Sequence, residues 1–139
     1  MSEINIILDT NVLHAGLYSS RGASYQILKL IEKGKIKIFL STALLFEYED
    51  VLKRNKRILK LTDSDIEKIL DNLCKLSDHQ KIYFLWRPYL PDPNDDLILE
   101  LAVASETKTI VTHNIKDFKG INKFGVRAIA PKILLEEIK

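Results

Sequence analysis

The chain has 139 residues, of which 46% are hydrophobic and 29% are charged, a mixture typical of folded globular proteins and too apolar for a disordered one. This length fits one ordinary domain, so we expect a single domain over residues 1–139. No apolar run reaches the roughly 18 residues that a membrane span needs, and the first residues lack the pattern of a secretory signal. We therefore expect a cytoplasmic protein with no membrane contact. The net charge of +2 neither demands nor excludes a polyanionic partner.

Strand patterns and helix patterns alternate along the chain. Short apolar runs rich in β-branched residues predict strands at residues 4–8, 37–40, 109–111 and 126–129. Apolar residues at helical spacing, bounded by caps, glycine or proline, predict helices at residues 23–33, 42–52, 62–73, 95–104 and 131–138. This alternation predicts an α/β fold, a three-layer sandwich in which helices flank a central parallel sheet. The aromatic stretch from Tyr83 to Trp86 fits either the core or a contact surface.

Polar side chains follow two of the predicted strands. Asp9 to Asn11 come directly after the first strand, and Thr112 to Asn114 come directly after the strand at 109–111. In an open parallel sheet, ligands bind in the crevice beyond the carboxyl ends of the strands, so both segments can face one crevice. Asp95 and Asp96 open the preceding helix, where negative charge is favoured. The sequence therefore places several acidic side chains near one edge of the sheet.

These acids favour metal-assisted hydrolysis over other chemistry. Hard cations such as magnesium take oxygen ligands and keep several waters, so a few carboxylates suffice. The chain has no nucleophilic serine elbow and no glycine-rich phosphate loop. Its histidines lack the spacing of a zinc site; they are His14, His79 and His113. What remains is a site where bound cations activate water and stabilise charge on a phosphoryl group.

Four segments in order resemble the PIN-domain family across nearly the whole chain. They are Ile7-Leu8-Asp9-Thr10-Asn11-Val12, Glu47 within 41–52, Asp92-Pro-Asn-Asp-Asp96 followed by 97–102, and Ile110-Val-Thr-His-Asn-Ile-Lys-Asp-Phe118. Each segment alone is weak, but their order and spacing together are specific. The likeness is greatest to bacterial and archaeal members regarded as toxins of toxin–antitoxin pairs. The resemblance implies a PIN-like, Rossmann-like fold and a magnesium- or manganese-dependent endoribonuclease that hydrolyses RNA.

The resemblance also assigns site residues. It implies that the catalytic, metal-binding acids are Asp9, Glu47 and Asp96. Polar positions that line the site match Thr10, Asn11 and Thr112. Glu49 and Asp95 are near neighbours that are easily confused with the assigned acids; Glu47 is preferred because it precedes Tyr48, as in the family pattern.

The fourth acidic position of the family departs from the pattern. It holds Asn114, two residues after Thr112, so that corner of the site is neutral. An amide oxygen can still accept a hydrogen bond from water or approach a cation. Asp117, three residues further on, could supply the charge instead, although it also suits a turn or a cap.

A basic run extends from Lys53 to Lys60 without an acidic residue. Such a run can present positive charge to phosphates, and it equally suits a solvated helix end. The residues we expect to contact RNA are Lys53, Arg54, Lys56 and Arg57.

The resemblance implies RNA as substrate, a small antitoxin protein as partner and a homodimer. Two other interpretations remain open. One is a weakly active or inactive PIN module that binds RNA or a protein partner, as the neutral Asn114 would allow. The other is an RNA-processing nuclease without a dedicated antitoxin.

Overall fold

The computed structural model describes residues 4–82 and 89–138. The strands are β1 (Ile4–Leu8), β2 (Ile36–Leu40), β3 (Ser77–His79), β4 (Thr109–Val111) and β5 (Arg127–Ile129). The helices are α1 (Thr10–Tyr18), α2 (Ala23–Glu32), α3 (Thr42–Arg54), α4 (Lys56–Leu59), α5 (Asp63–Leu76), α6 (Pro93–Ala104) and α7 (Pro131–Ile138), with 3-10 turns η1 (Ile115–Phe118) and η2 (Ile121–Phe124). The stretch from Tyr83 to Trp86, which we could not assign to core or surface, lies outside the described residues.

The strands form one five-stranded sheet in the order β3-β2-β1-β4-β5. Every pairing is parallel, and β1 lies in the middle with Ile4 opposite Ile36 of β2 and Ile7 opposite Ile110 of β4. The predicted parallel sheet is therefore confirmed. Because the strands share one direction, the ends of β1, β2 and β4 meet at the same edge of the sheet.

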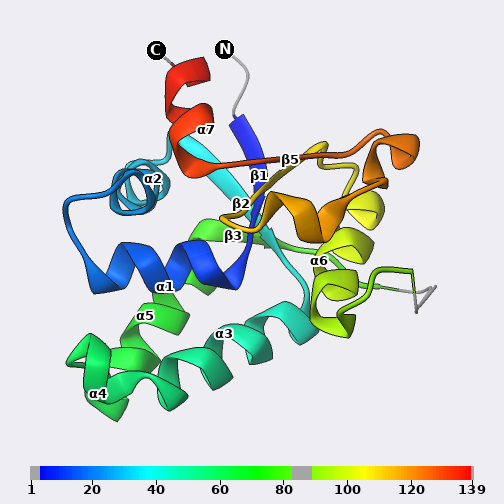
Figure 1. Cartoon of the computed structure of the whole chain (residues 1–139). Coiled ribbons are helices and arrows are strands. Elements are labelled where there is room, and N and C mark those ends of the chain that lie inside the picture. Colours follow the sequence, from blue (N-terminus) through cyan, green and yellow to red (C-terminus); the bar gives the residue numbers. More distant parts are fainter. Residues whose placement is uncertain (1–3, 83–88, 139) are drawn as a thin grey trace.

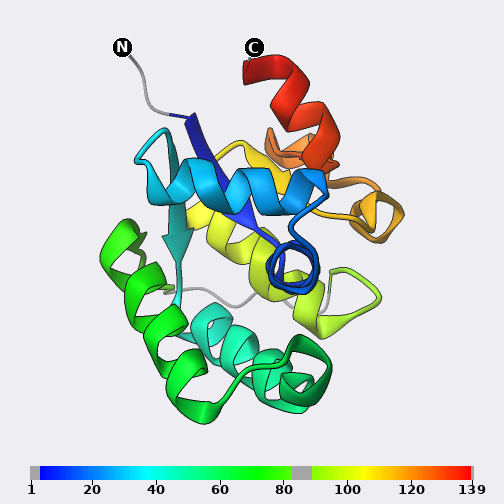
Figure 2. The same cartoon turned by 90° about the vertical axis from the view of Figure 1, so that its left-hand side faces the viewer.

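Helices cover both faces of this sheet (Figure 1). Helices α1 and α2 pack together on one face, where α2 also contacts α7, and α6 lies on the opposite face against β1 and β4. Figure 2 shows α3, α4 and α5 gathered at the end of the molecule away from the two termini. This arrangement is the predicted three-layer sandwich.

The core runs through the centre of the sheet. Ile6, Ile7 and Leu8 are consecutive and fully buried, as expected for a parallel strand covered on both faces. Tyr48 of α3 is also fully buried, and its hydroxyl donates a hydrogen bond to the carbonyl of Leu8. This bond fixes α3 directly beneath the end of β1.

The segment after β1 is a helix that the sequence patterns did not predict. Helix α1 begins at Thr10, immediately after Asp9, and runs to Tyr18. Gly16 lies inside this helix, and a Cβ there would come within 2.5 Å of Leu28 Cδ1 in α2. The glycine therefore permits close packing of α1 on α2 at a position that reads in sequence as a break.

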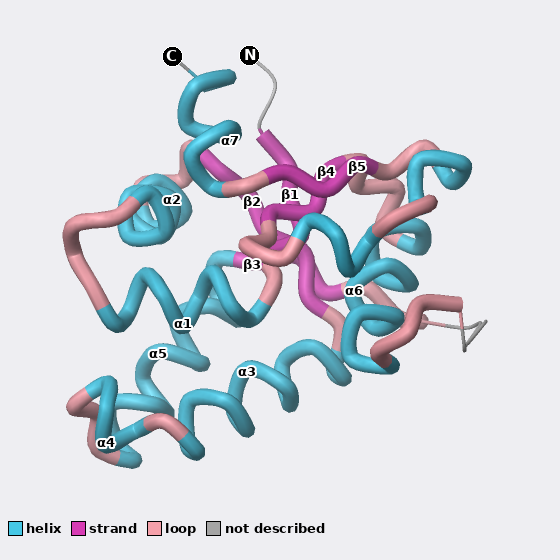
Figure 3. Tube along the Cα trace, in the orientation of Figure 1, coloured by secondary structure: helices cyan, strands magenta, loops and turns pink. Residues whose placement is uncertain are grey.

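Two short elements were not expected from the sequence (Figure 3). Strand β3 is only three residues long and polar, and it forms the edge of the sheet beside β2. Helix α4 is a single turn within the basic run. The longer elements agree with expectation, including the capping box of Thr62 and Asp65 at the start of α5. None of the helices in the described residues has the length and apolar character that a membrane crossing requires.

Candidate metal centre

A network of side-chain hydrogen bonds joins the ends of β1 and β4. The Thr112 hydroxyl donates to Oδ2 of Asp9 at 2.7 Å, and the Asn11 amide donates to the same oxygen at 3.3 Å. The backbone N–H of Asn114 donates to the Thr112 hydroxyl oxygen at 3.0 Å. The two polar strand ends therefore do face one crevice, as the parallel topology predicts.

Asp9 is a buried carboxylate at the centre of this crevice, with only 6% of its surface exposed. Burial raises its pKa, and the hydrogen bonds from Thr112 and from the Thr10 backbone lower it. The charge of Asp117 raises the pKa of Asp9 further, whereas the charge of His113 lowers it. Asp9 is thus held in place by neutral donors while an acid and a histidine act on it from the rim.

Glu47 lies in the second turn of α3, which starts directly after β2 with Ser41 as its N-cap. Burial raises the pKa of Glu47, and the charges of Asp50, Asp9 and Asp92 raise it further against a lowering by Arg54. The neighbouring acid Glu49 forms an ion pair with Lys53 at 3.3 Å. Of these two acids, Glu47 is therefore the one whose electrostatic environment includes Asp9.

The start of α6 turns its two adjacent acids in different directions. The Asp96 carboxylate is 2% exposed and accepts the backbone N–H groups of Leu90 at 2.8 Å and Tyr89 at 3.4 Å. The pKa of Asp95 is raised to about 7, first by burial and then by the charges of Asp9, Asp92, Asp117 and Asp96. Asp96 thus holds the segment before α6, while Asp95 belongs electrostatically to the cluster around Asp9.

The fourth corner of the site contains both a neutral residue and an acid. Asn114 is exposed and occupies the N-cap position of η1 without a side-chain hydrogen bond, and its backbone N–H donates to the Thr112 hydroxyl oxygen. Asp117 is half-buried, and its charge raises the pKa of both Asp9 and Asp95. The negative charge of this corner therefore comes from Asp117.

The donor set fits a hard divalent cation held mainly through water. Across residues 4–82 and 89–138, no three His, Cys, Asp or Glu side chains lie close enough together to hold one ion. Magnesium, however, is commonly bound by one or two carboxylates together with waters. The raised pKa values of Asp9, Glu47 and Asp95 reflect acids whose mutual repulsion and burial are not offset, which is the condition a cation relieves.

Thr10 adds an unusual feature beside Asp9. Its hydroxyl oxygen is buried and has no hydrogen-bond partner among the described residues. A buried hydroxyl normally finds a partner, because leaving it unpaired costs free energy. The expected site-lining role of Thr10 is consistent with a partner such as bound water.

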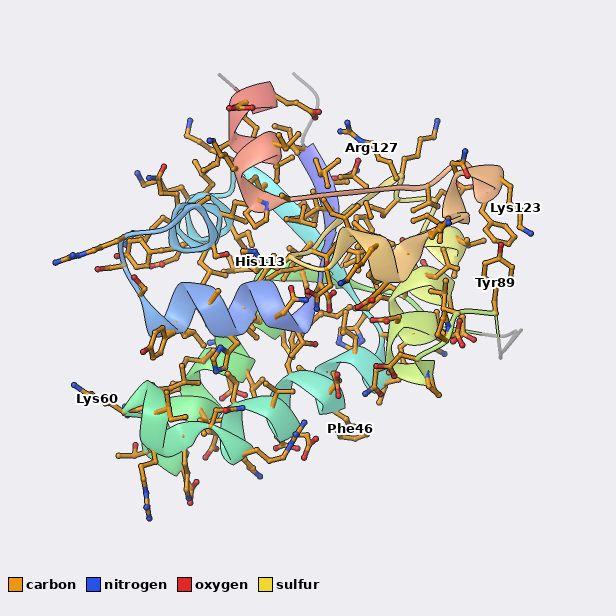
Figure 4. All side chains as sticks on the ribbon, viewed as in Figure 1. Phe46, Lys60, Tyr89, His113, Lys123 and Arg127 are labelled. Atoms are coloured by element: carbon orange, nitrogen blue, oxygen red, sulfur yellow. The ribbon has the colours of Figure 1, made fainter. Side chains whose placement is uncertain are left out.

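A contact that sequence spacing does not predict lies at the rim. The Oγ atom of Ser24, in the first turn of α2, is 2.8 Å from Nε2 of His113, and the two residues are 89 positions apart in sequence. The backbone N–H of His113 donates to Oδ1 of Asn11 at 3.1 Å. Figure 4 labels His113 near the middle of the view. Only folding brings this pair together, so no local signal could have identified it.

The basic run is partly neutralised by neighbouring acids. Lys53 pairs with Glu49 at 3.3 Å, Arg54 with Asp50 at 3.0 Å, and Lys56 with Asp63 at 3.0 Å. Within the described part of the chain, Arg57 and Lys60 form no ion pair. The run lies beyond Glu47 along α3. At a rise of 1.5 Å per residue, Arg54 is about 10 Å from Glu47 along the helix axis.

A groove on another part of the surface is not lined by Asp9, Glu47 or Asp95. It has a volume of about 610 Å³ and runs between α3 and α5. Its lining includes Leu45, Ile66 and Leu70, with the exposed Phe46 at its side.

Comparison with known proteins supports this fold and identifies its family. The sequence pattern of a family described as "PIN domain" matches residues 5–116, which include every acid discussed above except Asp117. A search of curated proteins found no match. Among solved structures, the chain is similar to the crystal structure of VapBC2 from Rickettsia felis bound to a DNA fragment from their promoter. That match has a TM-score of 0.61 and 21% identity, and it covers 90% of this chain and 97% of the other. At this identity the likeness concerns the fold alone.

Proposed function

Because the chain belongs to the PIN domain family, we propose that it is a divalent-metal-dependent endoribonuclease acting as the toxin of a toxin–antitoxin pair. The observation that carries this proposal is the position of Asp9. It directly follows the central strand and is buried. Its charge also raises the pKa of both Glu47, on α3, and Asp95, on α6. A nuclease that uses a cation needs such convergence of acids at one open edge.

The residues proposed to surround magnesium or manganese, in part through bound water, are Asp9, Asp95, Glu47 and Asp117. Asp95 replaces Asp96 in this set, because the Asp96 carboxylate is engaged by the backbone of Tyr89 and Leu90. When bound, the cation supplies activation of water and stabilisation of negative charge on the phosphoryl group.

The remaining residues orient these ligands. Thr112 and Asn11 both donate to Oδ2 of Asp9, which leaves its other oxygen, Oδ1, free of side-chain donors among the described residues. Such outer partners fix the rotamer of a ligand, and their loss typically reduces metal affinity or activity about 10–100-fold. Asp96 acts through structure, by holding the segment that leads into α6.

RNA as substrate follows from the family resemblance of the sequence. Arg57 and Lys60 have no ion pair among the described residues, which leaves positive charge on α4 and its end available for phosphates. A weakly active or inactive module is the alternative suggested by the neutral Asn114. The charge of Asp117 next to Asp9 favours the active enzyme over this alternative.

The proposal also includes an antitoxin partner, a homodimer and a cytoplasmic location. It further treats residues 1–139 as a single domain. The fold match to VapBC2 supports the antitoxin partner. A processing nuclease without an antitoxin would have the same site. Co-purification of a small protein encoded beside this gene distinguishes the two, and light scattering on the purified chain tests the dimer.

The proposed activity is tested by incubating purified protein with single-stranded RNA and added manganese, with and without EDTA. We expect internal cleavage that requires the metal and stops with EDTA. The matched single-stranded DNA is the control substrate. Cleavage that persists in EDTA, or no cleavage with either metal, contradicts the proposal.

A further inference from the structure

His113 lies at the rim of the acidic crevice, and its side chain contacts Ser24 of α2. It follows Thr112 at the end of β4 and is exposed, whereas Ser24 in α2 is buried with 4% of its surface exposed. The 2.8 Å contact between Ser24 Oγ and His113 Nε2 fixes the imidazole ring against α2. An exposed side chain that is fixed by a buried hydroxyl is already ordered for an external ligand.

The pair is connected to Asp9 through the backbone of His113. The N–H of His113 donates to Asn11, and the Asn11 amide donates to Asp9. A positive charge on the His113 ring would lower the pKa of Asp9, so the ring lies within electrostatic reach of this acid. A ligand bound at Asp9 on the side of α2 would therefore meet this ring.

The free edge of the ring has a chemistry that the rest of the crevice lacks. The charged groups around Asp9 are otherwise mainly carboxylates, which repel a phosphodiester. Nδ1 of His113 has no hydrogen-bond partner in the described residues. When Ser24 donates its hydroxyl proton to Nε2, the neutral ring carries its own proton on Nδ1 and can donate it.

We propose that His113, oriented by Ser24, contacts the bound RNA by donating a hydrogen bond to a phosphate oxygen on the α2 side of the crevice. This inference rests on the proposed function, because it requires RNA to lie across the acids. Phosphate contacts of this kind fix the position of a nucleic acid without reading its sequence. His113 is thus a substrate-contacting residue, and Ser24 is a positioning residue that acts through it.

The test compares wild type with His113→Ala and Ser24→Ala. The probe is a fluorescent single-stranded RNA of mixed sequence, bound in EDTA so that no cleavage occurs. We expect His113→Ala to raise Kd about tenfold, as for loss of one hydrogen bond to a charged group, and Ser24→Ala to raise it about threefold. With manganese, KM should rise in parallel while kcat and manganese affinity remain unchanged.

His79→Ala is the matched control, because His79 is an exposed histidine at the end of the edge strand β3. Its Kd and KM should equal those of wild type. If His113→Ala does not fold, His113→Asn keeps an amide at the position and is measured in its place.

A purely structural tie between α2 and β4 predicts a different pattern. It would lower the Tm, kcat and manganese affinity of both variants and leave Kd in EDTA unchanged, which would overturn the inference. If wild type binds RNA and His113→Ala binds it equally well, the inference alone fails. If wild type neither binds nor cleaves RNA, the proposed function fails, and the inference fails with it.

Discussion

Asp95 and Asp96 are neighbours in sequence but differ in what their carboxylates contact, and two single substitutions separate their roles. We expect Asp95→Asn to lower metal-dependent cleavage by more than the roughly 10–100-fold that an outer partner costs. Asp96→Asn should instead reduce the free energy of unfolding by about 1–3 kcal/mol, because a backbone N–H of Leu90 or Tyr89 loses its charged acceptor. Cleavage assays and urea unfolding of both variants check this. The opposite assignment, with Asp96→Asn inactive and fully stable, would restore Asp96 as a ligand.

Because the pKa of Asp95 differs between the folded and unfolded states, the free energy of unfolding of the metal-free protein depends on pH. This pKa rises from 3.8 to about 7 in the folded state, because of burial and the neighbouring acids. Between these values the native state holds a proton that the unfolded state has released, so stability is fully present below pH 3.8 and is lost as pH rises through about 7. The raised pKa values of Asp9 and Glu47 act in the same direction.

We therefore expect the Tm of wild type in EDTA to fall, relative to that of Asp95→Asn, as pH rises from about 4 to about 7. Thermal unfolding followed by circular dichroism measures the difference. Glu136→Gln, a change at an exposed acid of α7, is the control and should leave the pH dependence unchanged. A constant difference between wild type and Asp95→Asn across this pH range would argue against the acidic cluster.

Asp117 and Asn114 are the two candidates for the fourth acidic position of the site. Because the charge of Asp117 already acts on Asp9 and Asp95, we expect Asp117→Asn to weaken manganese binding and reduce cleavage at low metal concentration. Asn114→Asp should change both properties little, since Asn114 is exposed and contacts Thr112 through its backbone. Manganese titration by calorimetry distinguishes them. Tighter binding in Asn114→Asp with no effect of Asp117→Asn would reverse this assignment.

At the scale of elements, the end of α3 and the following turn α4 carry the basic run. Neutralising Lys53, Arg54, Lys56 and Arg57 together should weaken RNA binding and flatten its dependence on salt, because fewer counterions are released. Since three of the four already pair with acids, Arg57→Gln alone should account for much of the change. Glu49→Gln, which frees Lys53, is the informative control and should strengthen binding. An unchanged salt slope in the fourfold variant favours a merely solvated helix end.

The long elements could be predicted from the sequence because their patterns are local. Buried strands such as 4–8 and the capped helix at 62–73 have periodicity and capping residues that require no knowledge of the rest of the chain. Strand β3 could not be predicted in this way, since Ser77 and Asp78 are polar and become a strand only by pairing with β2. Helix α1 was missed because Gly16 reads as a break until its close contact with α2 is known.

The site was predictable to the level of the segment but not of every side chain. Asp9 and Thr112 follow their strands directly, so the parallel topology alone brings them together. Adjacent helix residues are about 100° apart around the axis, so Asp95 and Asp96 point in different directions, and the sequence does not show which of them faces the cluster. The contact of Ser24 with His113 depends on the packing of α2 and has no local signature.

At the scale of the whole molecule, the parallel sheet explains why acids from distant segments converge. Asp9 ends the central strand, Glu47 follows the strand on one side, and Asp117 follows the strand on the other. Helix α6 on the opposite face then brings Asp95 to the same edge. No side chain makes the site alone, and Asp9 is the acid whose charge acts on both Glu47 and Asp95.

The central role of Asp9 is tested most directly by comparing manganese-dependent RNA cleavage by Asp9→Asn and by wild type. The Tm of both proteins is also measured in EDTA. The substitution removes the central charge and keeps the shape, so we expect cleavage to fall to the level seen with EDTA. We also expect the metal-free Tm to equal or exceed that of wild type, because one repelling carboxylate is gone. A folded Asp9→Asn protein that cleaves RNA at the wild-type rate would contradict the central role of this acid.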